Sequence, residues 1–226
     1  PNVLDPGFAA GIEADSALHR WAVDLEAGTT KVAALPGLEL PLRPMLGCFG
    51  VAPPRGQAIS TATSGPYGGN MDYKGFQEGV TAFLPVFVKG GLFHIGDGHA
   101  WQSDGEILGT GIEISMDLEF GLGLIKNTKM SWPRGYDAAY IFTLGNARPL
   151  DQALQHATSE MLRWLIQDYD LSYDDANILI GTFVEYDVGN VYDPAYTMVC
   201  KIPIEALPTP RTESIITQSN LIFERS

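Results

Sequence analysis

The sequence predicts a mainly β, sandwich-like fold with a smaller α+β part near the C-terminus. Short apolar segments separated by turn residues fill most of the first 125 positions, as in all-β sandwiches and barrels. After residue 145 the spacing of the apolar residues changes to that of an α-helix. We therefore expect a β-rich body over residues 1–145 and an α+β segment over residues 146–226, packed together as one folding unit.

The strands expected in the body are short because turn residues interrupt them. Gly28 and the Pro36–Gly37 pair separate the first three. Glycines inside a later segment permit the close approach of another backbone or of a ligand. The expected strands cover residues 21–25, 31–35, 38–42, 80–88, 92–95, 106–114 and 116–126.

The stretch from residue 45 to residue 72 differs from its surroundings because it is rich in glycine and proline. It is too long for a hairpin loop, and long connections in compact domains are usually functional or disordered. The interspersed Phe49, Tyr67 and Met71 argue against disorder. We therefore expect a functional loop here.

Two helices are expected in the C-terminal part. In the first, apolar residues recur on one helical face, and Asp151 near its start suits the helix dipole. Ser172 and Asp175 resemble a capping box ahead of a second helix over residues 176–184. A strand over residues 199–204 follows. The apolar face of the first helix comprises Leu150, Leu154, Ala157, Met161 and Leu165.

The charge balance limits the possible partners. The chain has 14 Lys and Arg against 27 Asp and Glu, hence a net charge of −13, which repels phosphate backbones and anionic membrane surfaces. No run approaches the roughly 18 apolar residues that a membrane helix needs. Because no signal peptide opens the chain, we expect a cytoplasmic protein. A small neutral substrate or a cation fits this charge.

The stretch from Gly96 to Glu106 is the first candidate for chemistry. Asp97 and His99 are two positions apart, so both project from one face if the preceding strand continues. A carboxylate beside an imidazole is a usual ligand set for zinc and related divalent ions. The alternative is a turn in which Asp97 bonds to backbone N–H groups while His99 is exposed.

Two further pairs of residues are candidates. Asn70 and Asp72 have the same spacing as Asp97 and His99, although they also suit an Asx turn. A buried Glu106 or Glu113 would have a raised pKa, which suits a general acid or base near neutral pH. The alternative for both glutamates is a solvated face of a strand.

The two cysteines lack any metal-binding spacing. We expect Cys48 and Cys200 to be buried thiols, and a disulfide between them stays open. Because Cys48 lies beside the Gly-rich stretch, a hydrolase with a cysteine nucleophile also stays open. The Gly-x-Ser-x-Gly motif and the glycine motifs of nucleotide-binding loops are absent from the sequence.

Several segments together have a specific order and spacing. They are 47–53 (GCFGVAP), 65–72 (GPYGGNMD), 83–93 (FLPVFVKGGLF), 96–100 (GDGHA), 104–106 (DGE), 110–113 (TGIE) and 173–176 (YDDA). In this arrangement they resemble the acetamidase/formamidase family. The resemblance extends from about residue 21 to about residue 205.

The resemblance implies a β-sandwich-like fold and hydrolysis of short aliphatic amides, formamide or acetamide, to a carboxylate and ammonia. It also implies a divalent metal ion, zinc before calcium, and a small amide as partner. Carried over to this sequence, it gives Asn70, Asp72, Asp97 and His99 as metal ligands, and Glu106 and Glu113 as acid and base candidates. The backbone of Gly68 and Gly69 would hold the oxyanion, with Tyr67, Phe93 and Trp101 walling the pocket.

The sequence departs from the family in two ways. Family members are usually longer at the N-terminus, so we expect a preceding segment of the same precursor as a partner, besides a homodimer or higher homo-oligomer. Ser103 stands where many members have glycine, beside Glu106. An alternative function is therefore a non-catalytic binding or structural protein that keeps the amidase-like fold.

Overall fold

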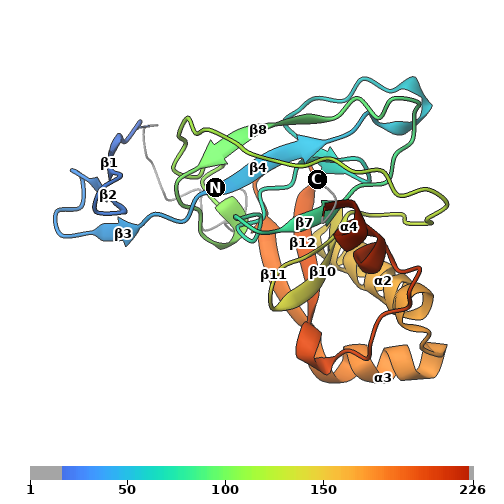
Figure 1. Cartoon of the computed structure of the whole chain (residues 1–226). Helices are drawn as coiled ribbons and strands as arrows, with labels where there is room; N and C mark the ends of the chain where they lie inside the picture. Colours follow the sequence, from blue (N-terminus) through green and yellow to red (C-terminus); the bar gives the residue numbers. More distant parts are fainter. Residues whose placement is uncertain (1–16, 224–226) are drawn as a thin grey trace.

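The computed structural model describes residues 17–223, whose strands form three antiparallel sheets (Figure 1). The first sheet has the order β1-β2-β3, the second β5-β6-β4-β8 and the third β11-β12-β10-β9-β7. The strands are β1 (Trp21–Asp24), β2 (Thr29–Val32), β3 (Glu39–Pro41), β4 (Met45–Gly50), β5 (Ser64–Gly65), β6 (Gly68–Asn70), β7 (Thr81–Phe83), β8 (His94–His99), β9 (Arg134–Tyr136), β10 (Tyr140–Ala147), β11 (Glu185–Asn190) and β12 (Tyr196–Pro203). The helices are α2 (Leu150–Tyr169), α3 (Tyr173–Phe183) and α4 (Ile215–Phe223), with short 3₁₀ turns η1 (Pro54–Gly56), η2 (Asp104–Glu106) and η3 (Ile204–Ala206).

The third sheet lies at the centre, with a core on each face. Phe142 and Leu144 of β10 pack with Phe49 of β4, on the side of the second sheet. Ile141 of the same strand packs with Trp164 of α2 on the other side. Successive strand residues point to opposite faces, so one strand supplies both cores. This arrangement confirms the predicted mainly β fold with an α+β part near the C-terminus.

Helix α2 lies close against β10 because of one glycine. A Cβ at Gly145 would collide with the backbone of Ala153 and Ala157, so a larger residue would push the helix away. The hydroxyl of Thr143 also donates a hydrogen bond to the carbonyl of Ala157, 2.7 Å away. The third sheet and its helices therefore form one packed unit.

A buried ion pair joins β9 to α2. The side chains of Arg134 and Glu160 have no exposed surface, and Arg134 Nε lies 2.8 Å from Glu160 Oε1. The guanidinium lies 5.4 Å from the ring centroid of Trp164. Burying two charges is costly, and removing one partner leaves the other uncompensated. The contact between β9 and α2 therefore depends on the complete pair.

The predicted cap of the second helix is present. The hydroxyl of Ser172 accepts a hydrogen bond from the N–H of Asp175 at 3.1 Å, which satisfies one free N–H group of the first turn. Helix α3 begins at Tyr173 and ends at Phe183, slightly earlier at both ends than predicted.

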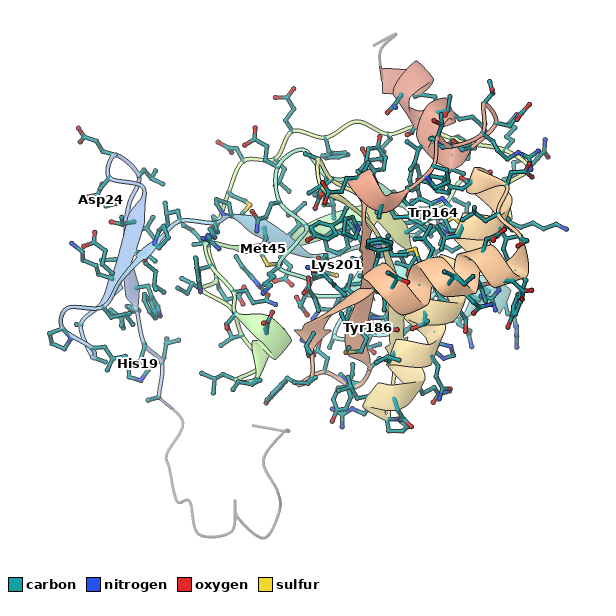
Figure 2. All side chains as sticks on the ribbon, turned by 90° about the horizontal axis from the view of Figure 1, so that it is seen from below. His19, Asp24, Met45, Trp164, Tyr186 and Lys201 are labelled. Atoms are coloured by element: carbon teal, nitrogen blue, oxygen red, sulfur yellow. The ribbon has the colours of Figure 1, made fainter. Side chains whose placement is uncertain are left out.

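The sheet β1-β2-β3 stands apart from the rest of the molecule (Figures 1 and 2). Figure 2 shows Asp24 on this sheet, far from the labelled Trp164. A hydrogen bond from the N–H of Arg43 to the carbonyl of Ala100, 2.9 Å long, links the chain that follows β3 to the body. The residues given for the two cores described above all lie from Leu46 onward, outside β1, β2 and β3.

One predicted strand is wrong in part and another is wrong. Residues 106–109 form turns, with Gly105 and Gly109 at positive φ values of 79° and 75°, whereas residues 112–114 hydrogen-bond to residues 98–101 and Glu113 forms an isolated bridge to His99. Residues 116–126 keep their alternating apolar pattern, but among residues 17–223 no strand pairs with them. Leu122 and Leu124 are therefore exposed.

Other strands were not predicted, for identifiable reasons. β4, β5 and β6 lie within the Gly-rich stretch that we expected as a loop. β10 is buried along most of its length, so its apolar run does not alternate. β11 is largely polar. The predicted boundary at residues 145 and 146 falls inside β10, so the third sheet takes strands from both sides of it.

Within residues 17–223, no helix combines the length and the apolar character needed to cross a membrane.

We predict that Glu160→Ala lowers the free energy of unfolding by about 3–5 kcal/mol, because it leaves Arg134 buried without a partner. Arg163→Ala is the control, since it removes a half-exposed partner of the same carboxylate, 3.0 Å away. It should cost at most about 1 kcal/mol. Urea denaturation measures both values, and equal losses would show that burial of the pair is unimportant.

Candidate active site

Three strands of the second sheet bring the predicted motifs together. β4 lies between β6 and β8, so Cys48 pairs with Asn70 on one side and with Gly96 on the other. Asp97 and His99 both belong to β8, as expected. Asp72 lies two residues after the end of β6, and its N–H donates to the carbonyl of Gly47 at 3.0 Å. The strand pairing thus places two distant sequence motifs at one end of the sheet.

The first cluster comprises Asp72, Asp97 and His99. One ligand atom from each lies within 4.8 Å of the others. Asp72 is fully buried, and its Oδ1 has no hydrogen-bond partner. A Cβ at Gly47 would collide with Asp72 Oδ1 and with Asp97 Oδ2. Glycine at this position therefore leaves a space between two carboxylate oxygens, one from β8 and one from the segment after β6.

The imidazole of His99 is held in a defined orientation. The side-chain amide of Gln102 donates to the carbonyls of Asp72 and Gly189, so its Oε1 is the acceptor for the His99 Nδ1–H at 2.8 Å. Nε2 then faces Asp97 Oδ1 at 3.3 Å and Glu113 Oε1 at 3.0 Å. Metal-binding histidines usually have their second ring nitrogen fixed in this way.

The second cluster comprises Asp72, Glu106 and Asp193, whose carboxylate oxygens also lie within 4.8 Å of one another. Two asparagine amides hold it together. Asn70 Nδ2 donates to Asp72 Oδ2 and to Asp193 Oδ2, both at 2.7 Å. Asn190 Nδ2 donates to Asp72 Oδ2 at 3.1 Å and to Glu106 Oε2. Uncharged amide groups thus donate hydrogen bonds to Asp72 Oδ2, Asp193 Oδ2 and Glu106 Oε2.

Burial and mutual repulsion shift the pKa values of the cluster. Burial, with repulsion from the neighbouring carboxylates, raises the pKa of Asp72 to about 9. Burial also raises the pKa of Glu106 to about 7, and that of Asp193 above its usual range. The hydrogen bond with His99 lowers the pKa of Asp97. Burial lowers the pKa of His99, but its bonds to Asp97 and the neighbouring glutamate outweigh this effect and raise it. The cluster contains more carboxyl groups than its one basic side chain, His99, can neutralise.

Glu113 lies at the exposed rim of the site. About half of its side-chain surface is exposed, and its Oε1 accepts hydrogen bonds from the Thr110 hydroxyl and the Gly111 N–H at 3.0 and 3.2 Å. Glu106 is buried on η2. The two predicted acid and base candidates thus differ in exposure, yet one ligand atom each of His99, Glu106 and Glu113 lies within 4.8 Å of the others.

Sequence reasoning missed four residues of the site. Gly47 opens the segment 47–53 already selected, and Gln102 lies three residues after His99 in another selected stretch, so both could have been found. Asn190 and Asp193 carry no motif signal of their own, and Asn190 is 118 positions from Asp72. These two become visible only when strands distant in sequence are paired.

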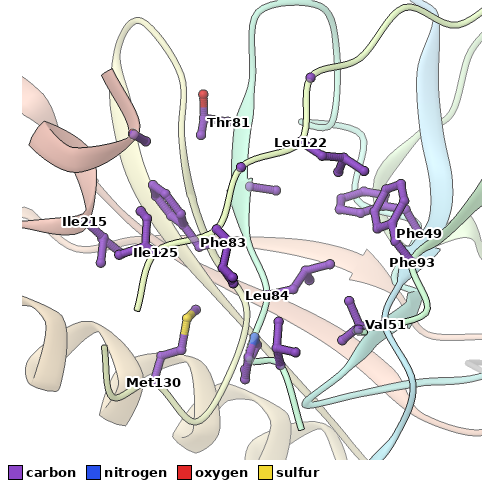
Figure 3. A pocket seen from close by; sticks show the side chains of 18 of the residues that line it. Phe49, Val51, Thr81, Phe83, Leu84, Phe93, Leu122, Ile125, Met130 and Ile215 are labelled. Atoms are coloured by element: carbon purple, nitrogen blue, oxygen red, sulfur yellow. The ribbon is translucent and has the colours of Figure 1, made fainter. Parts of the chain in front are cut away.

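The other predicted site residues do not share one pocket. Gly68 and Gly69 lie in β6, which pairs with β4 and β5 on its two sides. Phe93 lines an apolar cavity of about 920 Å³ (Figure 3). Trp101 lines a separate cavity of about 220 Å³, where the Arg43 guanidinium lies over its ring. Tyr67 is buried and borders neither cavity.

Both cysteines are free and buried. Burial, with repulsion from Asp97 and Asp72, raises the pKa of Cys48 to about 12. Burial likewise raises the pKa of Cys200 to about 12. A nucleophilic cysteine needs a lowered pKa, because the thiolate is the reactive form. The structure therefore disfavours the alternative of a cysteine nucleophile.

Residues 55–205, more than half of the chain, match the model of the Acetamidase/Formamidase family. The chain belongs to this family. Among curated relatives, it is 44% identical over 62 residues to a formamidase of Methylophilus methylotrophus, covering 27% of this chain and 15% of that protein. It is 39% identical over 84 residues to an acetamidase of Mycolicibacterium smegmatis, covering 37% of this chain and 20% of that protein.

Solved structures agree with this assignment over most of the chain. The acetamidase from Yersinia enterocolitica gives a TM-score of 0.74 at 33% identity, covering 84% of this chain and 56% of that one. The acetamidase from Bacillus halodurans gives 0.68 at 33% identity, covering 79% and 59%. The chain thus spans less than two thirds of the length of the relatives it matches.

We predict that Gly47→Ala weakens zinc binding at least tenfold, because the new Cβ would occupy the space between Asp72 and Asp97. Gly96→Ala is the matched control on β8, since a Cβ at Gly96 has nothing within 4 Å. Isothermal titration calorimetry measures both affinities. Equal affinities in the two variants would rule out this space as the cation position.

We predict that iodoacetamide leaves Cys48 and Cys200 unmodified in the folded protein at pH 7 and modifies both in urea. Buried thiols with raised pKa values contain almost no thiolate at neutral pH. Mass spectrometry of the intact chain before and after unfolding gives the result. Rapid modification of Cys48 in the folded chain would revive the nucleophile hypothesis.

Proposed function

We propose that this chain contains the site of an amidase that hydrolyses short aliphatic amides, such as formamide or acetamide, with the help of a divalent cation. The observation that supports this most strongly is the convergence of Asp72, Asp97 and His99 around the space that Gly47 leaves open. Membership of the Acetamidase/Formamidase family supports the reaction class.

The residues present fit a cation. Asp72 Oδ1 is buried without a partner, which is costly unless a ligand satisfies it. His99 Nε2 faces carboxylates while Nδ1 is held by Gln102. One imidazole with carboxylates suits zinc, and calcium is the alternative because oxygen ligands predominate. When bound, such a cation polarises a carbonyl and lowers the pKa of water.

Glu106 is the better candidate for proton transfer. It is buried beside Asp72 and has a pKa near neutral, so it can take a proton from water and return it to the amide nitrogen. The oxygen of that water bonds to the carbonyl carbon of the amide, the C–N bond then breaks, and the carboxylic acid and ammonia leave. Glu113 is half exposed, and its Oε1 lies 3.0 Å from His99 Nε2, so we place it at the rim of the site beside the cation position.

Substrate contacts beyond the cluster have less support. The oxyanion role of Gly68 and Gly69 stays a prediction, because β6 is paired on both sides and strand amides point towards the neighbouring strands. Tyr67, Phe93 and Trp101 do not enclose one space. A homo-oligomer is a further proposal, supported by the exposed apolar residues Leu118, Phe120, Leu122 and Leu124.

We predict that Asp97→Ala and His99→Ala each lower the bound zinc from about one ion per chain to near zero. Ammonia release from formamide should fall at least about 100-fold, because cation ligands are required for the reaction. Elemental analysis and an ammonia assay measure the two effects. His94→Ala, on the same strand but outside the cluster, is the control and should keep zinc and rate.

Full zinc content and full rate in both variants would refute this site. An unmodified chain that binds zinc yet releases no ammonia from any short amide would instead favour the non-catalytic alternative.

A further inference from the structure

Asn190 reaches the cluster because of an irregularity in its strand. The pairing of β11 with β12 shifts between Val188 and Asn190, which is a β-bulge at Gly189. Bulges redirect the side chain beside them and are frequent next to active sites. Gly189 suits this place, because a Cβ would come within 3.0 Å of the Thr197 side chain. The bulge leaves Asn190 at the end of β11, fully buried.

Every hydrogen-bonding group of the Asn190 side chain has a partner. Its Oδ1 accepts from the N–H groups of Tyr192 and Asp193 at 2.9 and 2.8 Å. These backbone donors fix which end of the amide is oxygen. Its Nδ2 therefore faces Asp72 and Glu106 and donates to both. An amide has two donors and two acceptor positions, and all four are used here.

A neutral amide is the side chain that this position needs. Asp72 and Glu106 repel each other, and burial raises the pKa values of both. A carboxylate at position 190 would add repulsion, and an alkyl group would remove the Asn190 donor from Glu106 Oε2 and leave Asp72 Oδ2 with Asn70 alone. An asparagine amide supplies two N–H groups to two carboxylates without adding charge.

The amide contacts also distinguish the two carboxylate oxygens of Asp72. Oδ2 accepts from Asn70 and Asn190, whereas Oδ1, on the side of Gly47, has no partner. The oxygen left for a cation is therefore the one that faces Asp97.

We propose that Asn190 is a positioning residue, which fixes Glu106 beside Asp72 and turns Asp72 Oδ1 towards the cation space. It acts through these two carboxylates and does not itself touch the substrate. This inference rests on the function proposed above for the same cluster.

The matched control is Asn146, which lies in register with Asn190 on the opposite side of β12 in the third sheet. Thr197 pairs with Asn190 on one side and with Asn146 on the other. Asn146 is also buried, and its Nδ2 donates to the Thr197 hydroxyl at 2.8 Å. Asn146→Ala therefore removes a buried amide from the same sheet without touching a carboxylate of the cluster.

The test compares Asn190→Ala with Asn146→Ala by zinc titration calorimetry and by steady-state kinetics on formamide. We expect Asn190→Ala to weaken zinc affinity by about 10–100-fold and to lower kcat with little change in KM. Asn146→Ala should stay within about threefold of the unmodified chain in both, since a difference of that size lies within packing effects. Equal losses in the two variants would overturn the inference.

A crystal structure of the Asn190 variant separates this inference from the proposed function. If the unmodified chain neither binds zinc nor hydrolyses amides, the function proposed above fails, yet the position of Glu106 still reports on Asn190. A Glu106 carboxyl turned away from Asp72 supports the inference, and an unmoved carboxyl overturns it. Asn190→Asp, equal in size, serves as a second variant with the same structural expectation if Asn190→Ala does not fold.

Discussion

The burial of Asp72 among other carboxyl groups is the constraint to which the rest of the site responds. This carboxylate is fully buried and has Asp97, Glu106 and Asp193 around it. Like charges this close cannot all stay ionised unless positive charge or donated protons balance them. The amides of Asn70 and Asn190 donate hydrogen bonds to Oδ2 of Asp72, and Oδ1 faces the space beside Gly47. The geometry of the cluster thus follows from the need to satisfy one buried carboxyl group with donors or a cation.

Strand pairing fixes the relative positions of the side chains that form the cluster. β4 holds β6 and β8 on its two sides, so the segments after residues 70 and 97 cannot move independently. The third sheet then brings β11 beside η2, and the bulge at Gly189 directs Asn190 towards the carboxylates. Helix α2 fixes that sheet from the opposite face. The site is therefore built where two sheets meet.

The sequence predicted the parts of this arrangement that depend on local pattern. Two-residue spacing correctly placed Asp97 and His99 on one strand, and helical periodicity located α2. The sequence did not predict features that depend on pairing with a distant strand. Residues 116–126 alternate as a strand would, but in the described part of the chain no strand pairs with them. The prediction also failed for Asn190, because nothing in the sequence around that residue reports a contact 118 positions away.

The most direct test of the proposed cation position is the location of a bound ion in crystals grown with zinc. An anomalous difference map at the zinc absorption edge shows the ion without reference to activity. We expect one peak per chain in the space that Gly47 leaves open, between the oxygens of Asp72 and Asp97 and facing His99 Nε2. Crystals that hold zinc elsewhere, with no peak in this space, would contradict it.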